Sequence, residues 1–427
     1  MQIDCTLAIV LCTRILKRNK KMKQVINLGR IPAKLWLTDM EQSCLEQVIN
    51  LTELPFAFHH VAVMPDAHAG LGMPIGGVLA TRAVVIPNAV GVDIGCGMCS
   101  VKTSLMAEDL DMDRRRELLE RIKAVVPTGF DHQSELQDPS LLPSLDDYDI
   151  DNMPIVKNQY TAARYQVGTL GGGNHFIEIQ RSTTNEVYIM IHSGSRNLGK
   201  RVADHYNNIA KYWNEKWYAP DTNDLAFMPI VFPEAKNYLR EMQYCVDFGL
   251  ANRKLMMERI CDQMREMFPM VQFEPMVNIA HNYAAWEHHF GNNVLVHRKG
   301  ATRARKDEIC LIPGSQGTKS YIARGLGNVD SFCSCSHGAG RLMSRKAAIQ
   351  RLNLQAELQR MEEQGIVNCI TTQDDLDEAP SAYKDITQVI ANERDLVEPI
   401  VELKPLLVVK APSAKDWQRG SKAKTID

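Results

Sequence analysis

The stretch Ala89-Val-Gly-Val-Asp-Ile-Gly-Cys-Gly-Met98 decides how this chain folds and what chemistry it carries. Apolar residues lead into Asp93, and Cys96 follows three positions later with a glycine on each side. Glycines let the backbone turn tightly and approach another atom, so the carboxylate and the thiol can face one point. The pair is a fragment of a metal site that needs further ligands, whereas a buried cysteine at a strand end is the structural alternative.

Composition describes an ordinary globular protein. The chain has 427 residues, of which 45% are hydrophobic and 23% charged, and its net charge is -2. This balance excludes bulk electrostatic wrapping of nucleic acid but allows a local basic groove. Eleven cysteines without regular spacing favour free thiols in a reducing compartment.

The two ends read as additions to one domain. An apolar run at 7–11 precedes a basic cluster at 14–23, the reverse of a secretory signal, so residues 1–21 are predicted to be an extension or a misassigned start. Residues 22–410 are predicted to form the domain and 411–427 a tail. No stretch reaches membrane-spanning length, so we expect a cytoplasmic protein without a membrane partner.

Hydrophobic periodicity predicts helices over 31–51, 108–126, 197–217, 235–268 and 276–290, and strands over 61–64, 76–87 and 187–191. The acidic stretch 130–158 has no sustained period and is predicted to be a surface insertion, of the kind that is a functional lid or disordered. Because candidate ligands run from 66 to 410, we expect a single α/β domain with central β-sheet layers flanked by helices.

Histidines recur at the mouths of glycine-rich loops. His175 follows three glycines and Asn174, and His192 opens the motif His-Ser-Gly-Ser-Arg196 seventeen positions later. One such histidine is more often structural, but two in this setting favour a ligand role. His281 is a third candidate, and His337 lies among small residues before Arg341, which is placed to meet an anion.

The stretch Pro313-Gly-Ser-Gln-Gly-Thr-Lys-Ser320 misses the spacing of a phosphate-binding P-loop, which excludes a P-loop kinase. A different backbone cradle for a nucleotide phosphate stays open.

Together these motifs resemble the RtcB family of RNA-splicing ligases, in order from about Met22 to Lys410. The stretches that carry the resemblance are Met64-Pro-Asp66, Gly91-Val-Asp-Ile-Gly-Cys-Gly97, Gly173-Asn-His-Phe-Ile-Glu178, His192-Ser-Gly-Ser-Arg196, Pro313-Gly-Ser315 and Ser334-Cys-Ser-His-Gly-Ala-Gly-Arg341. The family joins an RNA 3′-phosphate or 2′,3′-cyclic phosphate to a 5′-hydroxyl, using GTP and two Mn²⁺ ions through a guanylyl-histidine.

The resemblance implies a role for each matching residue. It places one metal on Asp93, Cys96 and His175, and a second on Cys96, His192 and His281. It makes His337 the nucleophile, oriented by Asp66, and Glu178 and Lys410 the readers of the guanine edge. The implied guanylate contacts are Asn174, His175, Phe176, Ile177, Glu178, His281, Asn282, Pro313, Gly314, Ser315, Gln316, Ser320, His337, Gly338, Ala339, Gly340, Tyr383 and Lys410. The implied RNA-phosphate contacts are Arg196, Lys299 and Arg341.

Departures from the family pattern are Asn197 and the alanines of Asp66-Ala-His-Ala-Gly. They bear on RNA preference more than on chemistry. A thiolate with imidazoles also suits Zn²⁺, so Mn²⁺ comes from the resemblance alone. The rival interpretation is a metal-dependent phosphoesterase or nuclease in which His337 is a general acid. A monomer is expected, and the natural RNA and the need for an archease activator stay open.

Overall fold

The computed structural model describes residues 24–219 and 223–413. The predicted extension at 1–21 lies outside the described residues, as does all of the predicted tail except 411–413. Within the described ranges, no helix combines the length and the apolar character that crossing a membrane requires.

The first large sheet has six strands in the order β1-β2-β3-β4-β12-β11, and only β2 and β3 run parallel. Its strands are β1 (Gln24–Ile26), β2 (Ala33–Leu35), β3 (Ala57–His68), β4 (Ile75–Thr81), β12 (Asn292–Lys299) and β11 (Asn282–His289). Asp66 lies near the end of β3 and Lys299 ends β12, so this sheet carries part of the predicted site.

The second sheet has seven antiparallel strands in the order β10-β6-β8-β7-β17-β15-β14. Its strands are β10 (Val277–Ala280), β6 (Gly97–Met106), β8 (Glu186–Ser193), β7 (Phe176–Ser182), β17 (Val397–Val409), β15 (Ser320–Gly325) and β14 (Ile309–Ile312). The two end strands, β10 and β14, lie close together, so the sheet curls towards a barrel.

Two short strand pairs complete the β structure. They are β5 (Val84–Val85) with β9 (Met228–Pro229), and β13 (Ala301–Arg303) with β16 (Ser334–Ser336). His337 directly follows β16, which sets the backbone of the predicted nucleophile.

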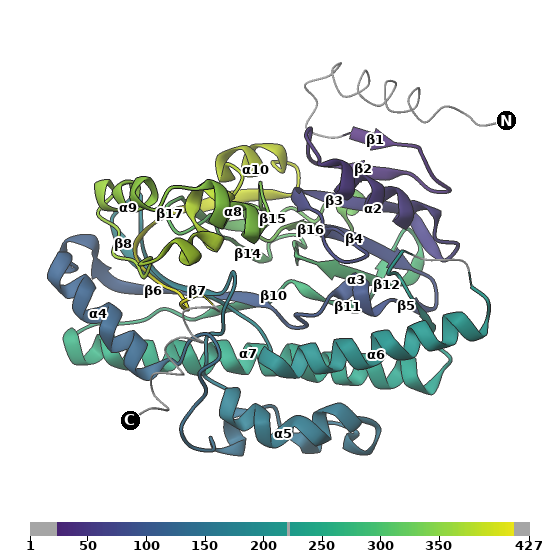
Figure 1. Ribbon diagram of the computed structural model, residues 1–427, viewed down its shortest axis with the longest axis horizontal. Helices are drawn as coiled ribbons and strands as arrows, with labels where there is room; N and C mark the ends of the chain where they lie inside the picture. Colours follow the sequence, from purple (N-terminus) through teal and green to yellow (C-terminus); the bar gives the residue numbers. More distant parts are fainter. Residues whose placement is uncertain (1–23, 220–222, 414–427) are drawn as a thin grey trace.

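Helices cover the outer faces of the sheets. They are α2 (Gln42–Glu53), α3 (Pro87–Val90), α4 (Met112–Val125), α5 (Pro154–Gln166), α6 (Arg196–Lys216), α7 (Pro233–Met267), α8 (Arg345–Arg351), α9 (Leu354–Glu363) and α10 (Ile386–Asn392). Figure 1 shows α6 and α7 side by side along one face of the molecule with α5 outside them. One core cluster joins α4 and α7 to β6, β7, β8 and β17, and another joins α5, α6 and α7. The α/β fold in one domain is therefore confirmed.

Side chains along β7 point alternately to the core and to the face of the sheet that carries the site. Ile177 and Ile179 join the core beneath α4 and α7, whereas Phe176 belongs to a cluster on the opposite face of the sheet. Because successive side chains of a strand point to opposite faces, Glu178 lies on the same face as Phe176.

The acidic stretch contains short 3₁₀ helices, η2 (Pro139–Leu141), η3 (Leu145–Asp147) and η4 (Ile150–Asn152), before α5 begins. Most of its side chains are exposed, as expected of a surface insertion. Gln133 anchors its start, because its Nε2 donates to the carbonyl oxygens of Val167, at 3.3 Å, and Gly168, at 3.0 Å. The remaining 3₁₀ helices are η1 (Ala107–Asp109), η5 (Val329–Ser331), η6 (Gln373–Glu378) and η7 (Pro380–Ala382).

Two predicted helices are wrong in whole or in part. Residues 276–290 form β10 and β11, not a helix, because Phe290 and Gly291 make a two-residue hairpin turn with positive φ at both positions (49° and 73°) and pair β11 with β12. The predicted helix at 31–51 begins only at Gln42, because residues 33–35 join the first sheet as β2.

Candidate metal centre and active site

Strand order brings the predicted metal ligands together. Strands β10, β6, β8 and β7 are neighbours in the second sheet, and their register pairs Gly97 with Ala280 and with Ser193, and Phe176 with His192. Cys96, His281 and His175 each lie one residue beyond a paired position, so they meet His192 at one edge of the sheet. Residues far apart in the sequence thus converge on a rigid scaffold.

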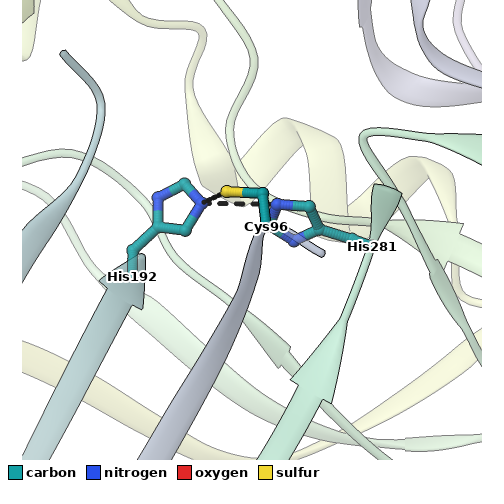
Figure 2. A group of neighbouring side chains, drawn as sticks. All are labelled: Cys96, His192 and His281. Carbon is teal, nitrogen blue, oxygen red and sulfur yellow. Dashed lines mark hydrogen bonds between the residues drawn. The ribbon is translucent and has the colours of Figure 1, made fainter. Parts of the chain in front are cut away.

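The ligand atoms face one another. Cys96 Sγ lies 3.2 Å from His192 Nε2 and 3.4 Å from His175 Nε2, and His192 Nε2 lies 3.3 Å from His281 Nε2. Figure 2 shows that one nitrogen of the His192 ring faces both the Cys96 sulfur and a nitrogen of the His281 ring. His175 Nε2 lies 3.1 Å from Asp93 Oδ2. The two triads therefore share Cys96, and within each triad the ligand atoms lie within 4.8 Å of one another.

Backbone carbonyls fix the tautomers of two ligands. His192 Nδ1 lies 3.1 Å from the Asn174 carbonyl oxygen, and His175 Nδ1 lies 3.0 Å from that of Leu170. Since a carbonyl only accepts, both Nδ1 atoms carry a proton, and Nε2 of neutral His192 offers a lone pair. His175 Nε2 faces the Asp93 carboxylate and offers a lone pair only when it is not donating to it. Arg196 Nη1 lies 3.2 Å from His175 Nδ1, but that nitrogen cannot accept while it donates to Leu170.

Burial and neighbouring charges shift the pKa values of the clustered side chains. Burial lowers the pKa of His192 and His281 well below the usual value, which keeps both imidazoles neutral. Burial, followed by the Asp93 carboxylate, raises the pKa of the Cys96 thiol, so cations must be present for it to act as a thiolate. Burial also raises the pKa of Asp93, but the hydrogen bond and charge of His175 outweigh this and lower the pKa to about 2.

The donor set fits two metal ions that share one thiolate. His192 Nε2 offers a lone pair 3.3 Å from His281 Nε2, and two neutral imidazoles placed in this way gain from a cation beside them. Asp93, Cys96 and His175 would hold one ion, and Cys96, His192 and His281 the other. The side chain of Asp93 is 35% exposed, so the first position opens to solvent.

Asp66 holds the ring of His337. The His337 Nδ1 atom lies 2.7 Å from Asp66 Oδ2, and the His337 backbone N–H donates to the same oxygen at 3.1 Å. Gly340 has a φ of +73°, and a Cβ there would lie 2.0 Å from the Asp66 carbonyl oxygen, so the histidine loop packs directly on β3. The His337 ring lies 4.8 Å, centre to centre, from that of His281.

His337 lines a cavity of about 140 Å³ beside the metal cluster. Predicted guanylate contacts that line it are Asn174, Phe176, Pro313, Gly314, Ser315, Gln316, His337, Gly338, Ala339, Gly340, Tyr383 and Lys410. This cavity is the candidate nucleotide pocket.

Other predicted guanylate contacts do not line this cavity. Ile177 lies in the core on the opposite face of the sheet, and His175 and His281 belong to the metal cluster. Asn282 joins two loops, because its Nδ2 donates to the Asp93 carbonyl at 2.9 Å and its Oδ1 accepts from Gly300 N at 2.6 Å.

Glu178 and Ser320 are not among the residues that line this cavity, and Gln180 links them to each other. Gln180 Nε2 donates to Glu178 Oε2 at 2.6 Å and to Ser320 Oγ at 3.1 Å. Ser320 Oγ in turn accepts the Gly314 N–H at 3.2 Å. Burial raises the pKa of Glu178 to about 8. Lys410 Nζ donates to the carbonyl oxygens of Gly173, at 2.9 Å, and His175, at 3.1 Å.

Sequence reasoning missed a carboxylate in the pocket wall. Glu378 accepts from Arg345 Nε at 2.6 Å and pairs with Arg341 Nη1 at 2.9 Å, and it also accepts from the Tyr383 hydroxyl. Burial raises the pKa of Glu378, but Lys410 and the two arginines outweigh burial and lower it. It lies in a polar stretch with no recognisable motif, so no sequence signal pointed to it. His68 and Ile75 were also missed as lining residues.

The three predicted phosphate contacts have different surroundings. Arg196 has a left-handed backbone (φ 58°), and its buried Nε has no partner among the described residues. Arg341 lines the nucleotide cavity and is held by Glu378. Lys299 is buried, and its Nζ donates to the carbonyl oxygens of Leu71, at 2.6 Å, and Asn88, at 3.2 Å. The lysine ammonium is thus engaged by the fold and does not line the nucleotide cavity.

Known proteins are similar in sequence to most of this chain. A family model described as tRNA-splicing ligase RtcB matches residues 47–411. The RNA-splicing ligase RtcB of Escherichia coli is 36% identical over 416 residues, covering 91% of this chain and 99% of that protein. The tRNA-splicing ligase RtcB of Thermococcus kodakarensis is 31% identical, covering 89% of this chain and 95% of that protein. The chain therefore belongs to the RtcB family.

Proposed function

We propose that this protein is an RNA ligase that joins a 3′-phosphate or 2′,3′-cyclic phosphate end to a 5′-hydroxyl end, using GTP and two Mn²⁺ ions through a guanylyl-histidine at His337. The observation that carries the proposal is the contact between His337 Nδ1 and Asp66 Oδ2 at 2.7 Å. A carboxylate at Nδ1 keeps the proton on that nitrogen, which leaves Nε2 free to attack. The family names of the relatives supply the substrate class.

The nucleotide role rests on the cavity that His337 shares with Lys410 and Tyr383. Attack of His337 Nε2 on the α-phosphorus of GTP would form a P–N bond and release pyrophosphate. Transfer of the guanylyl group to an RNA 3′-phosphate would then free His337, and attack of the RNA 5′-hydroxyl would release GMP.

Metal ions would supply positive charge where charge builds on the reacting phosphates. Asp93, Cys96, His175, His192 and His281 would hold them. The role of this chain's residues is to keep the imidazoles of His192 and His281 neutral and to bring one thiol between two positions. Arg196 is the cation we propose for an RNA phosphate, since its Nη1 lies 3.2 Å from His175 Nδ1 and its buried Nε has no partner within the described part of the chain.

The rival function is a metal-dependent phosphoesterase or nuclease, which needs no nucleotide. The experiment that separates the two supplies an RNA with a 3′-phosphate and a second RNA with a 5′-hydroxyl, with and without GTP and Mn²⁺. Ligation that requires GTP and disappears in His337→Ala supports the proposal. Metal-dependent cleavage that GTP does not affect, with no joined product, would contradict it.

A further inference from the structure

A second, larger cavity lies on the other side of the metal cluster. Its volume is about 780 Å³, and Asp93, Arg196 and Lys410 contribute to its wall. Since Lys410 also lines the nucleotide cavity, the two spaces adjoin. The nucleotide cavity holds His337, whereas the larger cavity meets the exposed carboxylate of Asp93. A molecule in the larger cavity therefore reaches the metal cluster without displacing a nucleotide.

An exposed aromatic ring stands in the wall of this larger cavity. Phe130 lines the cavity, and its side chain is 60% exposed. It occupies the tip of a tight turn, because Asp131 N donates to the Thr128 carbonyl at 3.1 Å and Gly129 has a φ of +65°. A positive φ at the second residue of a turn favours glycine, so Gly129 sets the turn that carries Phe130.

A short chain of contacts links the Phe130 turn to the metal centre. Gly129 N donates to the Gly171 carbonyl at 2.9 Å. Gly171 packs against Arg196, because a Cβ at this position would lie 1.8 Å from Arg196 Nη1. That Nη1 lies 3.2 Å from the ring of His175. Three contacts thus link the turn that carries the aromatic ring to the proposed metal ligand His175, on loops whose geometry favours glycine.

Cations surround the same space. Arg196 and Lys200, from the first turns of α6, line the cavity together with Asn197. The N-terminus of a helix adds partial positive charge beside them. His132 lines the cavity as well and lies close enough to Arg196 for the guanidinium to lower its pKa, after burial. Among the acidic side chains of the wall, the Asp375 carboxylate accepts hydrogen bonds from the backbone N–H groups of Thr371 and Ser413.

We propose that this cavity receives the terminal nucleotide of an RNA strand, with its base stacked on Phe130 and its phosphate near Arg196 and Lys200. This inference rests on the proposed function and adds to it a residue that holds the end of the RNA. A ring beside cations is the arrangement that holds single-stranded nucleic acid, because every base offers a π face whatever its sequence. The nucleotide at either joined end has this chemistry.

The test compares Phe130→Ala, Phe130→Leu and Phe130→Trp with Tyr212→Ala as the matched control. Tyr212 is also an exposed aromatic residue, but it lies 16 residues along α6 from Arg196, which is about 24 Å away. Binding is followed by the fluorescence of 2-aminopurine placed at the 3′-terminal position of one RNA or at the 5′-terminal position of the other. Stacking on Phe130 or Trp quenches the signal, whereas Ala and Leu restore it.

The same variants are assayed for ligation and for guanylylation without RNA. Phe130→Ala and Phe130→Leu should raise the KM for RNA roughly ten- to hundredfold while leaving guanylylation unchanged, and Phe130→Trp and Tyr212→Ala should behave as wild type. An abasic nucleotide at the stacked end should raise the KM of the wild type as much as the Phe130→Ala substitution does. The same abasic RNA should not raise the KM of Phe130→Ala any further. The end at which this holds is the one that the cavity receives.

Two results overturn the inference. One is unchanged quenching and KM in Phe130→Ala, and the other is additive losses from the alanine and the abasic end. Failure of the wild type to form a guanylyl adduct would contradict the proposed function instead. In that case the 2-aminopurine signal, which needs no catalysis, still decides whether Phe130 holds a terminal base.

Discussion

Oδ2 of Asp66 accepts two hydrogen bonds from His337, one from the ring Nδ1 at 2.7 Å and one from the backbone N–H at 3.1 Å. One carboxylate therefore fixes both the rotation of the imidazole and the position of its loop. Asp66 is buried at the end region of β3, while His337 follows β16, so the contact also joins two parts of the chain that are 271 residues apart.

Asp66→Asn should lower the rate of guanylylation by about a hundredfold or more, because an amide can donate to Nδ1 and move the ring proton to Nε2. The metal content should not change, since Asp66 is not among the clustered ligands. Single-turnover kinetics with labelled GTP and metal analysis of the same sample measure both. A variant that reacts at the wild-type rate would show that Asp66 does not set the tautomer.

Cys96→Ser should reduce occupancy of both metal positions together, because Cys96 belongs to both triads. His281→Ala and Asp93→Asn should each deplete mainly one position. Metal content per chain, measured after equilibration with limiting Mn²⁺, distinguishes these outcomes. If Cys96→Ser loses no more metal than His281→Ala, the thiolate does not bridge two ions.

Preference for GTP over ATP should depend on pH through Glu178. Guanine offers N1–H and an amino group to a carboxylate, but burial raises the pKa of Glu178 to about 8, so the carboxyl must lose its proton to accept them. The GTP-to-ATP affinity ratio should therefore rise with pH up to about 8, by at most about tenfold per unit, and then level off.

Glu178→Gln and Glu178→Ala should remove this pH dependence and narrow the GTP preference without loss of metal. Using the ratio of the two nucleotides cancels the titration of their shared triphosphate. A preference that keeps its size and pH profile in both variants would place recognition of the guanine elsewhere.

Stability at low pH should depend on Glu287. Burial raises the pKa of this carboxylate, but Arg298 and His289 outweigh burial and lower the pKa from 4.5 to about 2. A depressed folded-state pKa means that the stabilisation is complete above about pH 4.5 and is lost as the pH falls towards 2.

The corresponding free energy is on the order of 3 kcal/mol. Urea unfolding should therefore show Glu287→Gln far less stable than wild type at pH 7, with the gap closing below about pH 4.5. The control is Glu117→Gln, since the exposed pair of Glu117 and Arg121 contributes under about 1 kcal/mol. A gap for Glu287→Gln that stays constant with pH would contradict the assignment.

Local glycine motifs were enough to single out candidate ligands in the sequence, whereas the family resemblance supplied their division between two metal positions. Asp93, Cys96, His175 and His192 each lie at a glycine-rich turn or a strand end, and short motifs of this kind can be read without the fold. What the sequence could not show is that β10, β6, β8 and β7 are neighbours, which is a property of strand pairing across the whole chain. The helix predicted at 276–290 failed for the same reason, since pairing with β12 overrode a helix-like pattern.

Side chains that act through the fold were also beyond sequence reasoning. Glu378 matters because Arg341, Arg345 and Tyr383 all contact its carboxylate. No recognisable sequence motif connects it with these partners. Lys299 was predicted to contact an RNA phosphate, yet its ammonium donates hydrogen bonds to the carbonyl oxygens of Leu71 and Asn88. Whether a charged side chain meets a ligand or the protein's own backbone depends on tertiary packing.

The most direct measurement is to incubate the protein with GTP labelled at the α-phosphate and Mn²⁺, without RNA, and to map the labelled peptide by mass spectrometry. The account predicts an acid-labile, base-stable guanylyl group on His337, with release of pyrophosphate and no label in His337→Ala. Label on another residue, or RNA cleavage without any labelled protein, would contradict it.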